Sequence, residues 1–304
     1  MNRSLTLPIC LFLAGCGKDS SSTAPTAASA TPTPTTTASA TTTTLTFTST
    51  VTGNPVAGAR VVVAGAAYTT GDDGTITLSP PAAAAATMDV FAAGYLDRVT
   101  VVGSAATVTL WQVPPGADAN FVRQLAYNRG GTPEVLWRPT AAAIYLQLTG
   151  ELASDPLVRA AHVQAAAMAS ALTEGRVRIE LGNSVAGAGL FTILLNASNP
   201  GTVTTYLTQS GGTIQRGRIE YTTTAAARTV RIIAHELGHV LGFGHAPSGL
   251  MCPSACGVDA FGPWERDVFV SMWQRPPGTA PPDNDRVVAA RSQDSTGVFN
   301  CDIR

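Results

Sequence analysis

Residues 235–245 read His-Glu-Leu-Gly-His-Val-Leu-Gly-Phe-Gly-His, and this stretch decides how the second half of the chain is expected to fold. It contains three of the four histidines in the protein. On a helix, His235 and His239 lie one turn apart, so both imidazoles leave the same face. Apolar residues recur at helical spacing on the opposite face, which predicts a buried back and a histidine front. These apolar residues are Val230, Ile233, Ala234, Leu237 and Leu241.

His245 cannot join the other two histidines on a continuous helix, because six further residues would carry it roughly 9 Å along the axis. Gly242 is the position where the helix is expected to end, since glycine adopts the left-handed conformation without a Cβ clash. The chain then folds back and three imidazoles meet, a ligand set that suits Zn²⁺ with a fourth position open to water. Zinc lowers the pKa of such a water to about 7, and Glu236 is placed to take its proton.

This motif, followed by Ser248-Gly249-Leu250-Met251, resembles the metzincin metallopeptidases, and the short interval from His245 to Met251 resembles the matrixin branch. The resemblance implies zinc ligands at His235, His239 and His245, with Glu236 as the catalytic base. It also implies that Met251 lies beneath the metal in a methionine turn without ligating it. Met251 taken by itself is equally typical of a core residue.

The resemblance implies an α+β catalytic domain over residues 117–304, with a mixed twisted sheet, the active-site helix, the methionine turn and a C-terminal helix. Asp155 and Pro156 predict the start of an earlier helix that runs to about Leu172. The C-terminal helix is expected at residues 263–273. In this family an extended substrate adds to the edge of the sheet, and we take Thr202–Leu207 as the candidate edge strand. The strands are expected at residues 143–148, 177–181, 190–195, 203–207 and 218–221.

The first 44 residues are predicted to lie outside the folded domains. Residues 1–15 have Arg3 followed by a short apolar core, the pattern of a secretory signal. Leu13-Ala14-Gly15-Cys16 resembles the bacterial lipobox. The resemblance implies that the chain is cleaved before Cys16 and that this cysteine is acylated and anchors the protein in a lipid bilayer. It also implies the outer membrane or the cell surface as the destination. A plain secretory signal with an incidental cysteine is the alternative. Residues 16–44 are rich in Ser, Thr, Ala and Pro and predict a disordered tether.

Residues 45–113 predict a small all-β sandwich. Short alternating strands are separated by turns, and Asp73-Gly74 predicts a hairpin between Tyr68-Thr69-Thr70 and residues 75–78. The segment 53–59, Asp73-Gly74 and Ala93-Gly94-Tyr95 together resemble the carboxypeptidase-regulatory-like sandwich. Either an inert spacer or a module that binds a partner fits this pattern.

Three cysteines remain in the predicted folded part: Cys252, Cys256 and Cys301. In an oxidising compartment two of them are expected to form a disulfide, but their spacing does not choose the pair. Asp283, Asn284 and Asp285 form the densest acidic cluster, for which a solvated turn is the simpler interpretation and a Ca²⁺ site has no further support. Charged residues make up 13% of the chain with a net charge of −1, and no basic patch indicates nucleic-acid binding.

We therefore expect a lipid-anchored zinc endopeptidase that acts on protein or peptide substrates outside the cytoplasm; no oligomeric state is predicted. The sequence contains no cysteine-bearing segment like the propeptide that silences matrixins, so latency, if present, has another source. The alternative is a non-catalytic surface module for binding or adhesion that keeps zinc for stability. Glu236 speaks against that alternative, because a structural zinc site needs no base.

Overall fold

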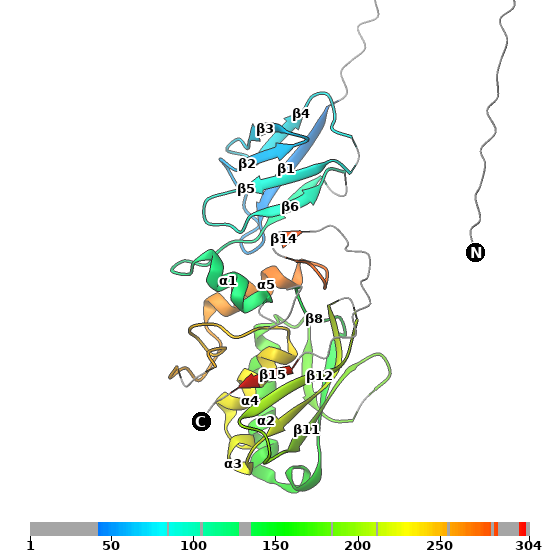
Figure 1. The fold of residues 1–304 in the computed structure, drawn as a ribbon, viewed down its shortest axis with the longest axis vertical. Coiled ribbons are helices and arrows are strands. Elements are labelled where there is room, and N and C mark those ends of the chain that lie inside the picture. Colours follow the sequence, from blue (N-terminus) through cyan, green and yellow to red (C-terminus); the bar gives the residue numbers. More distant parts are fainter. Residues whose placement is uncertain are drawn as a thin grey trace, which may run out of the picture. The chain divides into compact units, whose positions relative to one another are not determined.

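The structure is a computed structural model, shown in Figure 1. It describes residues 42–83, 85–103, 106–127, 135–183, 185–210, 212–253, 256–280, 283–284 and 298–301. The predicted signal peptide, Cys16 and residues 17–41 of the predicted tether lie outside this described part. The first strand begins at Thr43, so the last two residues assigned to the tether belong to a strand instead. Within the described residues, no helix has the length and apolarity needed to cross a membrane.

Seven strands of the N-terminal part of the described chain, joined by β14 (Asp283–Asn284) from its C-terminal part, form two sheets with the strand orders β4-β1-β7 and β14-β6-β5-β2-β3. Alternate residues of both sheets enter one hydrophobic cluster that includes Phe47, Val61 and Met88. This burial follows from the period-two alternation of apolar residues in each strand. The strands are β1 (Thr43–Ser49), β2 (Arg60–Val63), β3 (Ala66–Thr69), β4 (Thr75–Leu78), β5 (Thr87–Phe91), β6 (Arg98–Val101) and β7 (Thr107–Leu110).

The hairpin predicted around Asp73-Gly74 is wrong, although the turn itself forms. The Gly74 amide donates to the Gly71 carbonyl at 2.9 Å, and Gly74 has a φ of 70°. However, β3 pairs with β2 while β4 pairs with β1, so this turn carries the chain from one sheet to the other. An Asp-Gly pair indicates a tight turn, but which sheet the next strand joins depends on distant strands.

The C-terminal part is built on a larger mixed sheet with the order β10-β9-β11-β13-β12-β15, and β8 pairs with β13. Strands β10, β9, β11 and β13 run parallel, whereas β12 is antiparallel to β13 and β15 is antiparallel to β12. The strands are β8 (Arg138–Pro139), β9 (Ala143–Leu148), β10 (Arg178–Leu181), β11 (Gly189–Leu195), β12 (Thr202–Ser210), β13 (Thr213–Tyr221) and β15 (Val298–Cys301).

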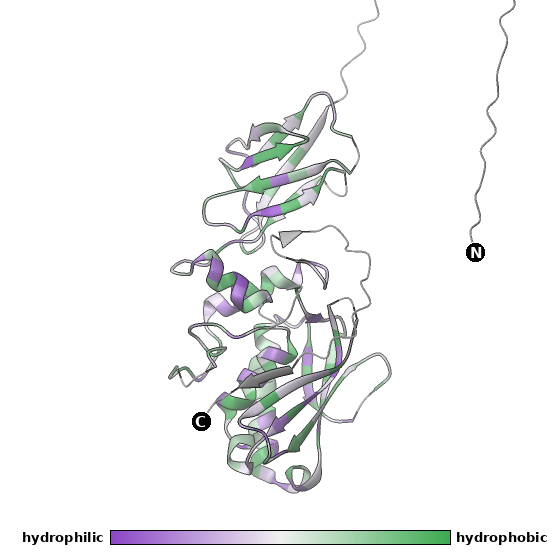
Figure 2. Ribbon diagram, in the orientation of Figure 1, coloured by the Kyte–Doolittle hydropathy of each residue, from purple (hydrophilic) through white to green (hydrophobic). Residues whose placement is uncertain are grey.

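Helices α2 and α4 lie side by side against one face of this sheet (Figure 1). The Asp155 side chain accepts hydrogen bonds from the amides of Leu157 and Val158, which confirms the predicted start of α2. Figure 2 shows apolar residues along these helices and along the strands, where they form the main core. The helical elements are α1 (Ala119–Tyr127), a 3-10 turn η1 (Gly150–Ser154), α2 (Pro156–Leu172), α3 (Thr224–Ala227), α4 (Val230–Val240) and α5 (Pro263–Trp273).

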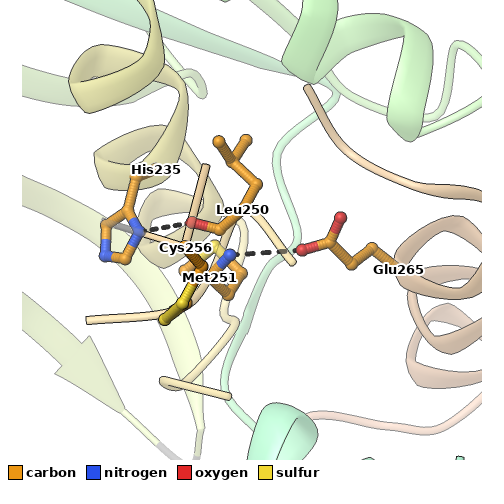
Figure 3. Close-up of a disulfide and its surroundings, with 6 residues drawn as sticks. His235, Leu250, Met251, Cys256 and Glu265 are labelled. Atoms are coloured by element: carbon orange, nitrogen blue, oxygen red, sulfur yellow. Dashed lines mark hydrogen bonds between the residues drawn. A yellow bond between two sulfur atoms is a disulfide. The ribbon is translucent and has the colours of Figure 1, made fainter. Parts of the chain in front are cut away.

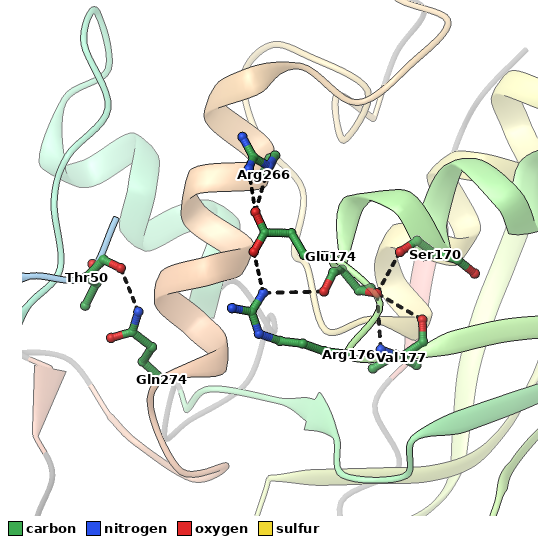
Figure 4. Close-up of polar contacts among 8 residues, drawn as sticks. Thr50, Ser170, Glu174, Arg176, Val177, Arg266 and Gln274 are labelled. Atoms are coloured by element: carbon green, nitrogen blue, oxygen red, sulfur yellow. Dashed lines mark hydrogen bonds and ion pairs between the residues drawn. The ribbon is translucent and has the colours of Figure 1, made fainter. Parts of the chain in front are cut away.

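Helix α5 connects several parts of the chain, as Figure 4 shows. Its Arg266 pairs with Glu174 at 2.5 Å, and Glu174 also pairs with Arg176 in the loop after α2. Just beyond α5, the Gln274 amide group donates to the Thr50 carbonyl at 2.6 Å. Helix α5 is therefore held from two sides, which matters because it supports the candidate site described below.

Two further predictions need correction, and one helix was not predicted. The candidate edge Thr202–Leu207 lies in β12, which is not an edge strand, because β15 pairs with its outer side. Asp283 and Asn284 form the short strand β14, which pairs with β6, so they are not a solvated turn; Asp285 lies outside the described residues. Helix α1 was not predicted. Val122, Leu125 and Ala126 are buried at helical spacing, and this pattern was the available indication.

Candidate metal centre

Helix α4 ends as the sequence predicted. Leu241 caps the helix, and Gly242 follows with a φ of 106°. The Gly242 amide donates to the His239 carbonyl at 2.8 Å, and the Phe243 amide donates to the Gly238 carbonyl at 3.0 Å. These two bonds form a Schellman motif, which satisfies carbonyls that the last turn of a helix otherwise leaves unpaired.

Gly242 is required for a second reason, which is the close approach of another segment. A Cβ at this position would lie 1.8 Å from the carbonyl oxygen of Trp137. Beyond it, the Gly244 amide donates to the Leu125 carbonyl of α1 at 2.6 Å. The loop that carries His245 is therefore fixed by the helix end, by the segment before β8 and by α1.

The three histidines converge. The ligand nitrogens of His235, His239 and His245 all lie within 4.8 Å of one another. Around a tetrahedral ion with bonds of about 2.0–2.1 Å, the ligand nitrogens lie about 3.3–3.4 Å apart, so the most distant pair has to close by at most about 1.5 Å. Among the described residues, no other group of three histidine, cysteine or acidic side chains is close enough to hold a metal ion. These three histidines could hold one.

Two of the rings are oriented by backbone carbonyls. His235 Nδ1 lies 2.6 Å from the Leu250 oxygen, and His239 Nδ1 lies 2.8 Å from the Phe243 oxygen. A carbonyl oxygen can only accept, so each Nδ1 carries the proton and each Nε2 keeps its lone pair for a metal. Burial lowers the pKa of His235 to about 3 and also lowers that of His245. Both rings are therefore neutral near pH 7, as ligands must be.

Glu236 is next to the ligands but is not on an exposed face. Its side chain is 0% exposed, and His235 and His239 are 1% and 0% exposed. The Thr204 hydroxyl on β12 donates to Glu236 Oε2, and the Tyr206 hydroxyl on the same strand donates to the His239 carbonyl. Strand β12 therefore packs against α4 at Glu236 and at the backbone of His239, a contact that the sequence did not predict.

Tyr221 and His162 lie beneath Glu236. The Tyr221 hydroxyl is 3.3 Å from His162 Nε2, and His162 Nδ1 is 2.9 Å from the Val158 carbonyl. Burial, and to a smaller extent the charge of Glu236, raise the pKa of Tyr221 well above its ordinary value. Burial lowers the pKa of His162 to about 4, so both groups are neutral at pH 7. His162 thus contributes to packing beneath the site and is not one of the converging ligands.

Met251 packs against Gly238 in the last turn of α4. A Cβ at Gly238 would lie 2.2 Å from the Met251 sulfur, so the glycine makes room for the thioether. Figure 3 shows how the turn at Met251 is held. Glu265 Oε1 on α5 accepts from the Met251 amide at 3.2 Å, while the preceding carbonyl of Leu250 accepts from His235. Helix α5 therefore positions a ligand ring through the turn.

Glu265 is itself unusual because it is a buried carboxylate. It is 0% exposed, and its Oε2 accepts from the Gly262 amide at 2.6 Å. Burial raises the pKa of Glu265 to about 7, although bonds from the Gly262 and Met251 amides oppose that shift. Glu265 was not predicted as a site residue, though its position three residues after Gly262 at a helix start is the usual place of a capping glutamate.

The structure joins Cys252 to Cys256, a choice that the spacing left open. Their Cα atoms are 6.1 Å apart, and the bridge closes a short loop directly after Met251 (Figure 3). Cys301 lies in β15 of the large sheet, whereas Cys252 and Cys256 lie outside the strands. The bridge therefore ties the segment beside the metal-binding residues to itself and not to the end of the chain.

A pocket of about 360 Å³ lies beside the loop that follows His245. Pro247 and Ser248 line one side of it, and Phe121 of α1 and Trp264 of α5 line another, with their rings 4.6 Å apart. Seven of the ten lining residues belong to residues 115–124, which comprise the start of α1 and the segment before it.

Neither protein-family models nor curated proteins match this chain. Chemically, the arrangement offers three neutral nitrogen ligands and a neighbouring carboxylate that receives a hydroxyl hydrogen bond. Such a set can hold a divalent transition metal and move a proton beside it.

Proposed function

We propose that this chain is a zinc-dependent endopeptidase. The observation that carries the proposal is the convergence of three imidazole nitrogens within 4.8 Å, with a carboxylate on the adjacent residue of the same helix. Three histidine ligands leave an open coordination position, which is typical of catalytic zinc and not of closed structural sites. Zinc held there supplies Lewis-acid polarisation of a carbonyl and acidifies water to a pKa of about 7.

The roles of the chain's own residues follow from their contacts. Glu236 accepts a proton from the attacking water and then donates it to the leaving amine of the cleaved bond. Thr204 orients the Glu236 carboxylate by its hydroxyl hydrogen bond to Oε2. Leu250 and Phe243 orient the imidazoles of His235 and His239 through their carbonyls. Glu265 acts one step further away, by anchoring the turn that presents the Leu250 carbonyl.

We also propose that the chain works outside the cytoplasm, as a lipoprotein anchored through Cys16. The Cys252–Cys256 disulfide supports an oxidising compartment, because such bonds are rare in the reducing cytosol. The lipobox-like sequence that ends at Cys16 supports the anchor.

A second candidate is a non-catalytic surface module in which the metal only stabilises the fold. The complete burial of Glu236 favours this candidate, since a base that meets substrate has to be reachable. The two candidates differ in what Glu236 does once the metal is bound.

The test is the Glu236→Gln variant, with Glu151→Gln as the matched control because Glu151 is exposed in η1. The peptidase proposal predicts one zinc per chain in all three proteins and a loss of hydrolysis of about 10²- to 10⁴-fold in Glu236→Gln alone. Metal content and cleavage of an unfolded protein substrate are measured on the same samples. Undiminished hydrolysis by Glu236→Gln would reject the mechanism, and zinc binding without hydrolysis by the unmodified chain would favour the second candidate.

A further inference from the structure

Strand β12 is the part of the large sheet that touches the candidate site. Its Thr204 donates to Glu236, and its Tyr206 donates to the backbone of His239. One side of β12 pairs with β13, so only its outer side is available to another strand. The opposite end of the sheet is β10, which is separated from β12 by three strands. An extended peptide that adds to this sheet next to Glu236 therefore has to use the outer side of β12.

That outer side is already taken by the end of the chain. Strand β15 (Val298–Cys301) pairs antiparallel with β12 over Thr202–Thr205. In this register Phe299 lies opposite Thr204, the residue whose hydroxyl contacts Glu236. One strand edge can form only one such ladder at a time, because each backbone donor and acceptor is used once. An extended peptide and β15 are therefore alternatives.

The burial of the site agrees with this occupancy. Glu236 and His239 are 0% exposed and His235 is 1% exposed, so a peptide carbonyl cannot reach them without movement of the covering structure. The pairing of β15 covers only four residues of β12, and elements held by few contacts are among the first to open locally. A short strand at the edge of the sheet is thus well suited to leave and return.

We propose that β15 is an intramolecular competitor for substrate, which occupies the β12 edge at rest and leaves it when an extended peptide binds. The inference rests on the proposed function for its biological meaning, because it assigns latency to the same site. The ligand class is an extended peptide that pairs antiparallel with β12 through its main chain.

The experiment compares the chain with a variant that ends at Gly297 and with the full-length variant Phe299→Pro. Proline cannot donate to a ladder and weakens strand pairing, so Phe299→Pro tests the same contact without removing residues. Ile303→Pro, which changes a residue beyond the end of β15, is the matched control. Circular dichroism and zinc content establish that each variant is folded.

Two readouts separate this inference from the proposed function. The first is binding of a fluorescent peptide that copies residues 296–303, measured by anisotropy. The second is kcat/KM for an unfolded protein substrate. We expect the peptide to bind the shortened chain and Phe299→Pro at least about 10-fold more tightly than the unmodified chain or Ile303→Pro. We also expect kcat/KM of the two altered chains to rise about 10- to 100-fold. Both effects follow because apparent affinity scales with the fraction of molecules in which the β12 edge is free of β15.

Equal peptide binding by all four folded proteins would overturn the inference, whatever their activity. A shortened chain that hydrolyses no faster than the unmodified chain would also overturn it. If no protein hydrolyses any substrate, the proposed function fails, while the difference in peptide binding still decides whether β15 competes for the edge. If the shortened chain does not fold, Phe299→Pro and its control give the answer.

Discussion

Replacement of Gly242 by alanine tests whether the end of α4 determines where His245 lies. Gly242 has a φ of 106°, and a left-handed backbone costs a residue with a Cβ about 1–2 kcal/mol. The added methyl group would lie 1.8 Å from the Trp137 carbonyl oxygen. Carbon–oxygen contacts normally lie at about 3.3–3.6 Å, so one of the two segments has to move by about 1.5 Å.

The consequence should be larger for metal binding than for folding. Overpacking typically costs about 1–3 kcal/mol, which together with the backbone cost gives about 2–5 kcal/mol of lost stability. Zinc ligands, in contrast, tolerate distance errors of only about 0.2 Å. A shift of the loop that carries His245 therefore removes one ligand, and we expect zinc affinity to fall by at least about 100-fold.

The assay is a zinc titration against a competing chelator, combined with urea unfolding. Gly175→Ala is the matched control, because Gly175 also has a positive φ, of 78°, but no atom lies within 4 Å of the added methyl. The control should lose stability and keep its zinc affinity. If Gly242→Ala bound zinc within about 3-fold of the unmodified chain, the argument that the helix end positions the third ligand would be refuted.

Three further perturbations test other parts of the site. Gly238→Ala would place a methyl group 2.2 Å from the Met251 sulfur. Because the thioether is flexible and can move aside, we expect the variant to lose about 1–3 kcal/mol of stability and to keep its zinc stoichiometry. Loss of zinc would contradict this expectation. Burial raises the pKa of Glu265 from 4.5 to about 7, so the folded state holds this proton between those pH values and gains stability as the pH falls. Glu265→Gln removes that gain, which amounts to at most about 3 kcal/mol. The variant should therefore lose stability faster than the unmodified chain when the pH falls from 7 to 4.5. Parallel curves of stability against pH for the two proteins would disprove the assignment. Chelation should lower the thermal midpoint and zinc should restore it, since free zinc at 100 times its Kd adds about 2.7 kcal/mol; a midpoint indifferent to zinc would argue against metal binding by the folded state.

The features that the sequence predicted correctly are local. The end of α4 at Gly242, the start of α2 at Asp155 and the bounds of α5 each depend on residues within one or two turns. Helix caps and the left-handed preference of glycine act over this distance, so a short stretch of sequence contains the whole cause. The convergence of the three histidines could also be predicted, because it depends on the same helix end.

The features that were missed depend on distant segments. Whether Glu236 is exposed is decided by β12, and the hydroxyl that contacts Glu236 comes from Thr204, 32 positions earlier. The pairing of β15 with β12 joins residues about a hundred positions apart, and hydrophobic periodicity carries no information about such a register. The same limit explains the wrong hairpin at Asp73-Gly74, where the turn was local but the pairing was not.

The most direct test of the central claim is a crystal structure of the zinc-soaked protein with anomalous diffraction data collected on both sides of the zinc edge. The account predicts one strong peak, about 2.0–2.1 Å from a ring nitrogen of each of His235, His239 and His245, with Glu236 beside it and no fourth protein ligand. A zinc-saturated crystal without a peak between these three rings, or with a fourth side chain that closes the coordination shell, would contradict it.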